Sequence, residues 1–412
     1  MKRTILLFLL LSTSLIWARV ISLDEAINIA LENSHDSQLN TINQNRVNSS
    51  YKSSLWDIAP DGSISYNWST QNNRPSTKTA GLTISKSIDS TLPDYFNWKT
   101  AKHNIEIAKI NSDKTTKSIA WNVLNSYIDL LLDQKKLDVY SKNYQIQLEI
   151  LKETNLQKEL GRKTIYEYNQ VEINTLNSQL NLINAEKDID KKIKNLLLLL
   201  NIEADTLSLQ DIDLDITPEY DFNIEQEKSY SIMISEMNID HSKLLLNQDR
   251  LRFFPDLSLA WTYSNNSMIN EPFEFNNYSS GSSWRISLSY PLLNFFKQGE
   301  SHYRNKENLL SEKINLDKQI DEFKTNYKNL VSDLDNLFLR KSINDKILEQ
   351  SRQNFEIAKT NFNLGIIKSI ELEQSRTELR EAELNSLDID YQIYRQQQAI
   401  NHLLSKKIAN KW

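Results

Sequence analysis

Two stretches of the chain alternate apolar and polar residues with a period of two. Residues 257–264 place leucine or an aromatic at each odd position, and residues 284–292 return with the same alternation. This pattern predicts paired β-strands with one apolar, aromatic face and one face of small, hydroxyl-rich residues, as in transmembrane β-barrels. A soluble sandwich strand gives the same alternation. The residues expected to face lipid are Trp261, Tyr263, Trp284, Ile286, Leu288 and Tyr290.

The strand pattern occurs twice along the chain. Residues 59–68 parallel residues 254–263, including a shared Pro-Asp pair, and residues 82–88 parallel residues 286–292. We therefore predict β-hairpins at about 60–90 and 255–292 within an internal duplication. Lys86 interrupts the apolar face of the first hairpin, and we expect it at an interface or on a less exposed strand.

Long polar runs without proline separate the hairpins. Their leucine and isoleucine residues form narrow stripes, which predicts coiled-coil-like helices. A run of about 65 residues would extend roughly 100 Å. A shorter helix opens each half. The expected helices are residues 97–160, 165–202, 296–364 and 369–408, opened by residues 23–55 and 224–253.

Glycine marks the turn between the long helices of each half. Gly161 and Gly365 each split a pair of long helices, and glycine suits the left-handed conformation that ends a helix. Each half is expected to run helix, strand hairpin, long helix, tip, returning helix. The predicted segments are a signal peptide at 1–18, a first repeat at 19–202, an acidic connector at 203–223 and a second repeat at 224–412.

The first residues predict export. Lys2 and Arg3 precede an apolar run from Ile5 to Leu11, and Ala18 offers a small residue for cleavage. The sequence contains no cysteine, so no disulfide framework supports the fold.

Catalytic and cofactor motifs are not found in the sequence. It shows no metal-binding histidine spacing, phosphate-binding glycine loop or nucleophile elbow, so we expect no enzyme, cofactor or metal. A net charge of -6 and the lack of a basic stripe make nucleic acid an unexpected partner. The histidines are scattered and expected to be solvated: His35, His103, His241, His302 and His402.

In this order, the features resemble those of the TolC-like outer-membrane efflux proteins. The matching stretches are residues 23–31, 255–259 and 362–365, followed by Glu371 and Leu372. The resemblance implies a mainly α fold with transmembrane β-strands. It implies a homotrimer with one shared 12-stranded β-barrel in outer-membrane lipid and one α-helical barrel in the periplasm of a Gram-negative-type bacterium.

The resemblance also implies partners: a periplasmic adaptor (membrane fusion) protein and an inner-membrane pump of RND, ABC or MFS type. The chain would be the exit duct for tripartite efflux or type I secretion. Independently, four strands per chain cannot close a barrel, and open sheet edges cannot face hydrocarbon, so an oligomer is required. Dimer, trimer and tetramer all satisfy that requirement, and only the resemblance selects the trimer.

The tips carry the candidate functional residues. Glu167 and Glu371 each follow a tip glycine by six positions, where the family places acids that constrict the periplasmic mouth. A local interpretation is equally open: Thr164 and Glu167 could form a capping box, and Glu371 could favour a helix start. The family's latching tyrosine and arginine are replaced by Phe362 and Ile367, and Arg162 is a candidate substitute.

Two alternatives to a duct are a trimeric adhesin and a non-conducting coiled-coil scaffold. Adhesin strands form one C-terminal block, whereas these hairpins are about two hundred residues apart. A scaffold would leave both hairpins unexplained. Trp412 follows lysines without strand alternation, so we interpret it as a tail.

Overall fold

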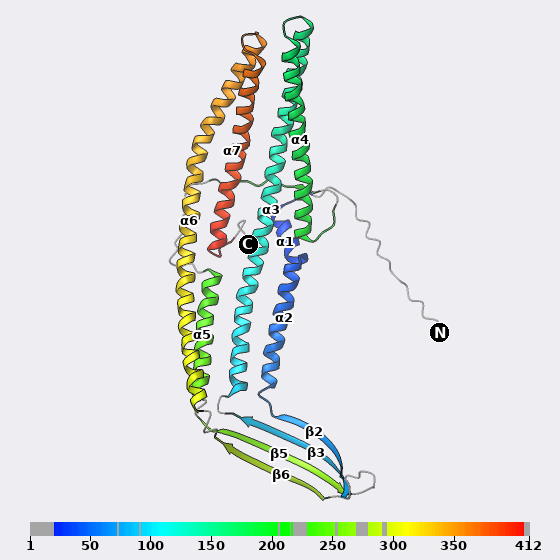
Figure 1. Cartoon of the computed structure of the whole chain (residues 1–412), viewed down its shortest axis with the longest axis vertical. Coiled ribbons are helices and arrows are strands. Elements are labelled where there is room, and N and C mark those ends of the chain that lie inside the picture. Colours follow the sequence, from blue (N-terminus) through cyan, green and yellow to red (C-terminus); the bar gives the residue numbers. More distant parts are fainter. Residues whose placement is uncertain are drawn as a thin grey trace, which may run out of the picture. The chain divides into compact units, whose positions relative to one another are not determined.

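A computed structural model describes residues 20–71, 74–89, 92–204, 207–214, 216, 229–251, 254–268, 279–290 and 295–407. The predicted signal peptide, Trp412 and 10 of the 21 residues of the acidic connector lie outside these residues. The helices and strands are shown in Figure 1. Their bounds are β1 Val20–Ile21, α1 Leu23–Asn33, α2 His35–Trp56, β2 Asp61–Gln71, β3 Arg74–Ile88, α3 Pro93–Glu159, α4 Ile165–Leu200, β4 Ser208–Leu209, α5 Tyr230–Leu251, β5 Asp256–Met268, β6 Ser279–Ser289, α6 Phe295–Asn363 and α7 Ser369–Leu403.

The predicted mainly α class is confirmed, and the described strands form one four-stranded sheet and one pair of two-residue strands. Among the described helices, none combines the length and apolar character needed to cross a membrane. The chain divides into two compact units. The first comprises Met1–Gln38, Thr115–Glu227 and Thr325–Trp412, and the second comprises Leu39–Lys114 and Lys228–Lys324.

The second unit contains the sheet. Its strand order is β2-β3-β5-β6 with every pair antiparallel, so β2 and β6 are the edges. The register places Ile84 opposite Trp261, and Trp261 opposite Trp284. Because residues directly opposite each other share a face, the apolar positions of the four strands lie on one side of the sheet.

The first unit has its main core where α1, α3 and α4 meet. Val123, Leu124 and Ile128 of α3 are fully buried there, as are Ala26 and Ile27 of α1. Burial of an apolar stripe stabilises a helix more than its intrinsic propensity does. The narrow apolar stripes predicted from the sequence are therefore enough to stabilise helices whose other faces are polar.

A small parallel ladder closes this core. β1 pairs with β4, which belongs to the connector, and Tyr127 Oη lies 2.8 Å from Ile21 O and 2.6 Å from Gln210 O. Burial raises the pKa of Tyr127 to about 12, so the hydroxyl stays protonated and can donate to these carbonyls. Two-residue strands have too little periodicity to be recognised in a sequence, and this ladder was not predicted.

Several predicted boundaries were wrong. The first helix is two helices, because Ser34 adopts an extended conformation (φ -62°, ψ 148°) that ends α1, and its hydroxyl accepts the Ser37 N–H at the start of α2. Pro93 is the first residue of α3, a position where proline is favoured since its missing N–H would be unpaired anyway. β6 ends at Ser289, so Tyr290 lies just beyond the strand.

Candidate functional site

The two helix tips have the same backbone. Gly161 and Gly365 adopt positive φ values of 73° and 76°. Arg162 N–H donates to Gln157 O at 2.8 Å, and Ile366 N–H donates to Asn361 O at 2.9 Å. These six-to-one bonds define a Schellman ending, which satisfies helix carbonyls and requires a left-handed residue. Nothing lies within 4 Å of a Cβ added at either glycine, so the backbone conformation alone selects glycine there.

Glu167 is held locally at the first tip. Thr164 and Glu167 form a complete capping box at the start of α4, which confirms the local interpretation of this residue. Thr164 N–H donates to Glu167 Oε2 at 3.0 Å, and Lys163 Nζ lies 3.3 Å from Glu167 Oε1. The hydrogen bond from the Thr164 backbone, followed by those from the Thr164 and Lys163 side chains, lowers the pKa of Glu167.

Glu371 has a different environment at the second tip. Lys368 occupies the N-cap of α7 and makes no side-chain capping bond, while Glu371 N–H donates to Lys368 O at 3.1 Å. The Glu371 side chain is exposed. The two glutamates are therefore equivalent in sequence but not in their local contacts, and a role for either in a constriction stays a prediction.

A contact between the tips involves Lys163 rather than Arg162. Lys163 Nζ lies 4.7 Å from the ring centroid of Phe362, a cation–π distance. Phe362 is fully buried, and Ile367 packs against the same apolar cluster, which also contains Ile150, Val171, Phe355 and Leu372. Arg162 is exposed. At the positions where the family has a polar latch, this chain therefore has apolar residues that pack in a core. The Lys163 ammonium lies against the Phe362 ring of this core.

A buried polar network joins α3 to α7 behind the tips. Arg376 is only 3% exposed, and its guanidinium donates to Asn143 O at 3.2 Å and to Glu373 Oε1 at 3.1 Å. Gln147 Nε2 donates to Glu373 Oε2 at 2.5 Å, and Asn143 Nδ2 donates to Ser178 Oγ at 2.8 Å. This network was not predicted, because an arginine in a polar helix gives no sign that it faces inward.

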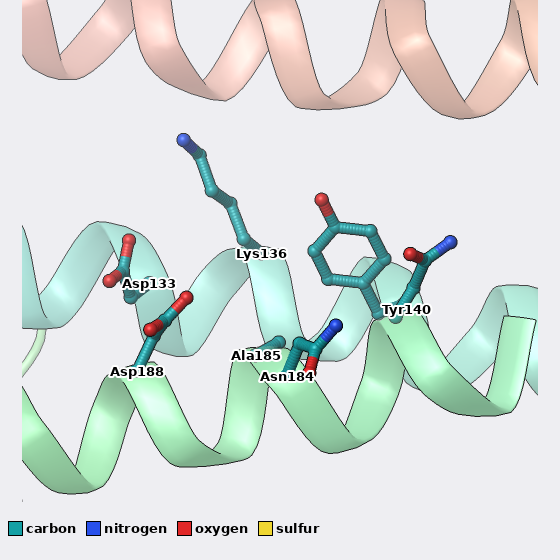
Figure 2. A pocket seen from close by; sticks show the side chains of 7 residues that line it. Asp133, Lys136, Tyr140, Asn184, Ala185 and Asp188 are labelled. Carbon is teal, nitrogen blue, oxygen red and sulfur yellow. The ribbon is translucent and has the colours of Figure 1, made fainter.

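A polar groove lies farther from the tips between α3 and α4. Its volume is about 260 Å³, and its lining includes Asp133, Lys136, Tyr140, Asn184 and Asp188. Figure 2 shows Lys136 extending away from these two helices toward a third ribbon. Lys136 Nζ lies 2.6 Å from Asp388 of α7. Among the described residues, no cluster of three or more His, Asp or Glu side chains could hold a metal ion.

The sheet has two chemically different faces. Trp284, Ile286 and Leu288 of the edge strand β6 are 71%, 74% and 70% exposed. The opposite face presents mostly serine and threonine, with Arg285 among them. Trp261 and Tyr263 lie on the apolar face and are half-buried beside their neighbours. The predicted alternation of side-chain chemistry is present, while the contact with lipid stays a prediction.

Lys86 lies on the apolar side of β3, opposite Leu259. Its ammonium donates to Asp57 O at 2.6 Å and pairs with Asp94 Oδ2 at 2.5 Å. Asp57 follows α2 and Asp94 is in the first turn of α3, so Lys86 ties the end of the sheet to the helices of the same unit.

Three histidines stack on aromatic rings, contrary to the expectation that all are simply solvated. His103 and His241 stack with centroids 5.5 Å apart, and His402 stacks on Trp121 at 5.3 Å. Burial, followed by the neighbouring His103, lowers the pKa of His241. The nearly parallel rings of His103 and His241 are a packing contact between α3 and α5.

Comparison with known proteins identifies this architecture. Residues 225–406 match the family described as "Outer membrane efflux protein". No curated protein sequence matches the chain. Several solved structures share the fold, among them the following three. The Campylobacter jejuni CmeC outer membrane channel is 16% identical with a TM-score of 0.81, covering 93% of this chain and 85% of CmeC.

CusC is 16% identical with a TM-score of 0.84, covering 93% of this chain and 92% of CusC. The open state of the Neisseria gonorrhoeae MtrE outer membrane channel is 14% identical with a TM-score of 0.80. The match covers 94% of this chain and 90% of MtrE. The fold therefore extends the likeness to the first half, which the family match does not reach. Residues 225–406 thus resemble outer membrane efflux proteins, and the chain as a whole has the fold of solved outer membrane channels.

Proposed function

We propose that this protein is the outer-membrane exit duct of a tripartite efflux system, assembled as a homotrimer with a periplasmic adaptor and an inner-membrane pump. The observation that carries the proposal is the match of residues 225–406 to the outer membrane efflux family. The four-stranded sheet with an apolar face and two open edges supports it. The same duct would serve a pump of RND, ABC or MFS type, and type I secretion would use it as well.

The sheet edges explain why one chain is insufficient. β2 and β6 are separated by two antiparallel partners, so β6 of one copy meets β2 of the next in antiparallel orientation. Three copies would close a ring of twelve strands and leave no unpaired edge in hydrocarbon. The apolar face would then contact lipid and the hydroxyl-rich face would line the pore.

Native mass measurement of the mature protein in detergent tests the assembly, and we expect a mass close to three times that of one chain. A monomer would contradict the duct. Quenching of Trp261 and Trp284 tests the orientation of the sheet. Quenchers attached to lipid should reduce their fluorescence strongly, whereas quenching only by a pore-restricted aqueous quencher would reverse the assignment of the faces.

Glu167 and Glu371 would form a ring of six acids at the periplasmic mouth of the trimer. Ionised, such a ring attracts cations, as acid rings do in cation channels. Single-channel recording under a salt gradient should show cation preference that weakens on acidification and is lost when both residues are changed to Gln. An unchanged reversal potential in that variant would leave helix capping as their role.

A further inference from the structure

Two histidines face each other between the helices that lead into the centre of the sheet. The rings of His103 on α3 and His241 on α5 have centroids 5.5 Å apart and planes inclined by 14°. His103 lies ten residues after Pro93, the first residue of α3, and His241 lies ten residues before Leu251, the last residue of α5. α3 follows β3 and α5 precedes β5, and these two strands pair with each other. The histidine contact therefore lies within one compact unit, on the two helices that continue the central strands.

The surroundings of the two rings favour their neutral forms. In each ring Nε2 is buried and has no hydrogen-bond partner among the described residues. A neutral imidazole has one N–H and one unprotonated nitrogen, whereas an imidazolium has an N–H at both nitrogens. Protonation of either ring would therefore place a buried N–H at Nε2 with no acceptor, and an unpaired buried donor is costly.

Charge acts in the same direction as burial. Burial, followed by the charge of His103, lowers the pKa of His241. If both rings were protonated, two like charges would lie 5.5 Å apart, and each would disfavour the other. The charged residues next to the pair along both helices are exposed to solvent, and Asp240 is paired with Lys243 at 2.8 Å. These exposed neighbours are Lys102 and Glu106 of α3 and Asp240 and Lys243 of α5.

The direction of the pH effect follows from the lowered pKa of His241. In an unfolded chain a histidine titrates at about 6.5. Because the folded-state pKa of His241 lies below its unfolded value, the contact has its full stability above about pH 6.5 and loses it as the pH falls through the folded-state pKa. Acid therefore acts on this contact in a range where most carboxylates are still ionised.

We propose that the His103–His241 contact is an acid-sensitive contact, which opens and frees α5 from α3 beside the sheet when the rings take up protons. Clusters of histidine that are protonated at about pH 5–6 open packed interfaces in this way. Ser301 and Asn305 of α6 donate to Asp249 near the end of α5, so this end of α5 stays attached to α6 when it leaves α3. The inference goes beyond the proposed duct and does not depend on the number of chains in the assembly.

Hydrogen exchange followed by mass spectrometry tests the contact in the mature protein in detergent. Exchange would be measured at about pH 7.5 and about pH 5, with rates corrected for the intrinsic effect of pH, so that the histidine range is covered. The protection of α5 around His241 should fall by about threefold or more in acid, since one pKa unit corresponds to a tenfold change. The protection of α4, which contains no histidine, should stay the same. Unchanged protection of α5 in acid would overturn the proposal.

A variant that cannot take up the proton separates this effect from a general effect of acid. His241→Gln should give α5 the same protection at both pH values. His35→Gln is the matched control, because His35 is exposed on α2, and it should lose protection in acid as the wild type does. Each variant is compared with itself at the two pH values, so a packing defect present at both cancels. A loss of protection in His241→Gln equal to that of the wild type would refute a role for the pair. If His241→Gln does not fold, the comparison of α5 with α4 in the wild type decides.

Discussion

The two helical hairpins have similar lengths and the same glycine turn, and their equivalent residues are 204 positions apart. Their returning helices, α4 and α7, nevertheless differ in burial. α7 is buried along the face that meets α3, with Tyr391 and Tyr394 4% and 7% exposed. The equivalent positions on α4 are Lys187 and Asp190, and both are exposed. The two hairpins share one fold, but equivalent positions of their returning helices differ in whether they are buried within the chain.

The cores differ in the same way. Tyr127 of α3 is fully buried and holds the connector, while its equivalent on α6 is Val331, which cannot make such a bond. Thr164 caps α4, while its equivalent before α7 is Lys368, which makes no side-chain capping bond. Each difference can be tested by changing one member of an equivalent pair.

The largest effect is expected at the buried network of the second hairpin. Arg376→Ala would leave Glu373 and Asn143 without their main donor between α3 and α7. Breaking a buried ion pair costs about 3–5 kcal/mol, and we expect the lower end because Glu373 is partly exposed. Urea unfolding followed by circular dichroism would measure the loss. Glu378→Ala, exposed on the same helix, is the control, and equal losses in both would contradict a buried role for Arg376.

Tyr127→Phe should have the next largest effect. It removes the hydroxyl beside Ile21 O and Gln210 O while keeping the ring, so we expect a loss of about 1–3 kcal/mol, as for a buried hydrogen-bonding group left without its partner. Tyr140→Phe, at the α3–α4 groove, is the matched control and should change stability by less than about 0.5 kcal/mol. If the two variants unfold at the same urea concentration, the hydrogen bonds of the Tyr127 hydroxyl contribute nothing measurable to stability.

The sequence predicted the long helices, their glycine tips and the paired strands because each rests on a local pattern. The alternation in residues 257–264 is sufficient to predict a strand, and the glycine at position 161 is sufficient to predict a helix end. What could not be predicted depends on partners distant in sequence. Arg376 meets Asn143, and Lys163 meets Phe362, only once the hairpins lie side by side. The break at Ser34 was missed because the residues around it continue a helical composition.

A smaller effect is expected at the helix starts. Lys368 and Thr164 have nearly the same backbone, with φ and ψ of -83° and 159° against -81° and 160°. Lys368→Thr should therefore form a capping box with Glu371 and stabilise the chain by about 1 kcal/mol, whereas Thr164→Ala should lose about 0.5–2 kcal/mol. Thermal unfolding of both variants, with Lys368→Ala as the control, measures the difference. A destabilised Lys368→Thr variant would mean that Lys368 has a role of its own at the tip.

The smallest effect distinguishes the two roles of Glu167. Its local bonds lower its pKa below the usual 4.5 in the single chain, so its contribution to stability is present above that value and is lost as the pH falls through the lower folded-state pKa. A crowded ring of acids would do the opposite, because neighbouring carboxylates raise the pKa and ionisation would then destabilise the assembly as the pH rises. Wild type and Glu167→Gln should be compared by thermal unfolding from about pH 7 to about pH 3. An advantage of the wild type that shrinks with acid supports the cap, since Gln cannot lose a charge. A wild type that gains on the variant with acid would mean that repulsion within the ring outweighs the bonds from Thr164 and Lys163.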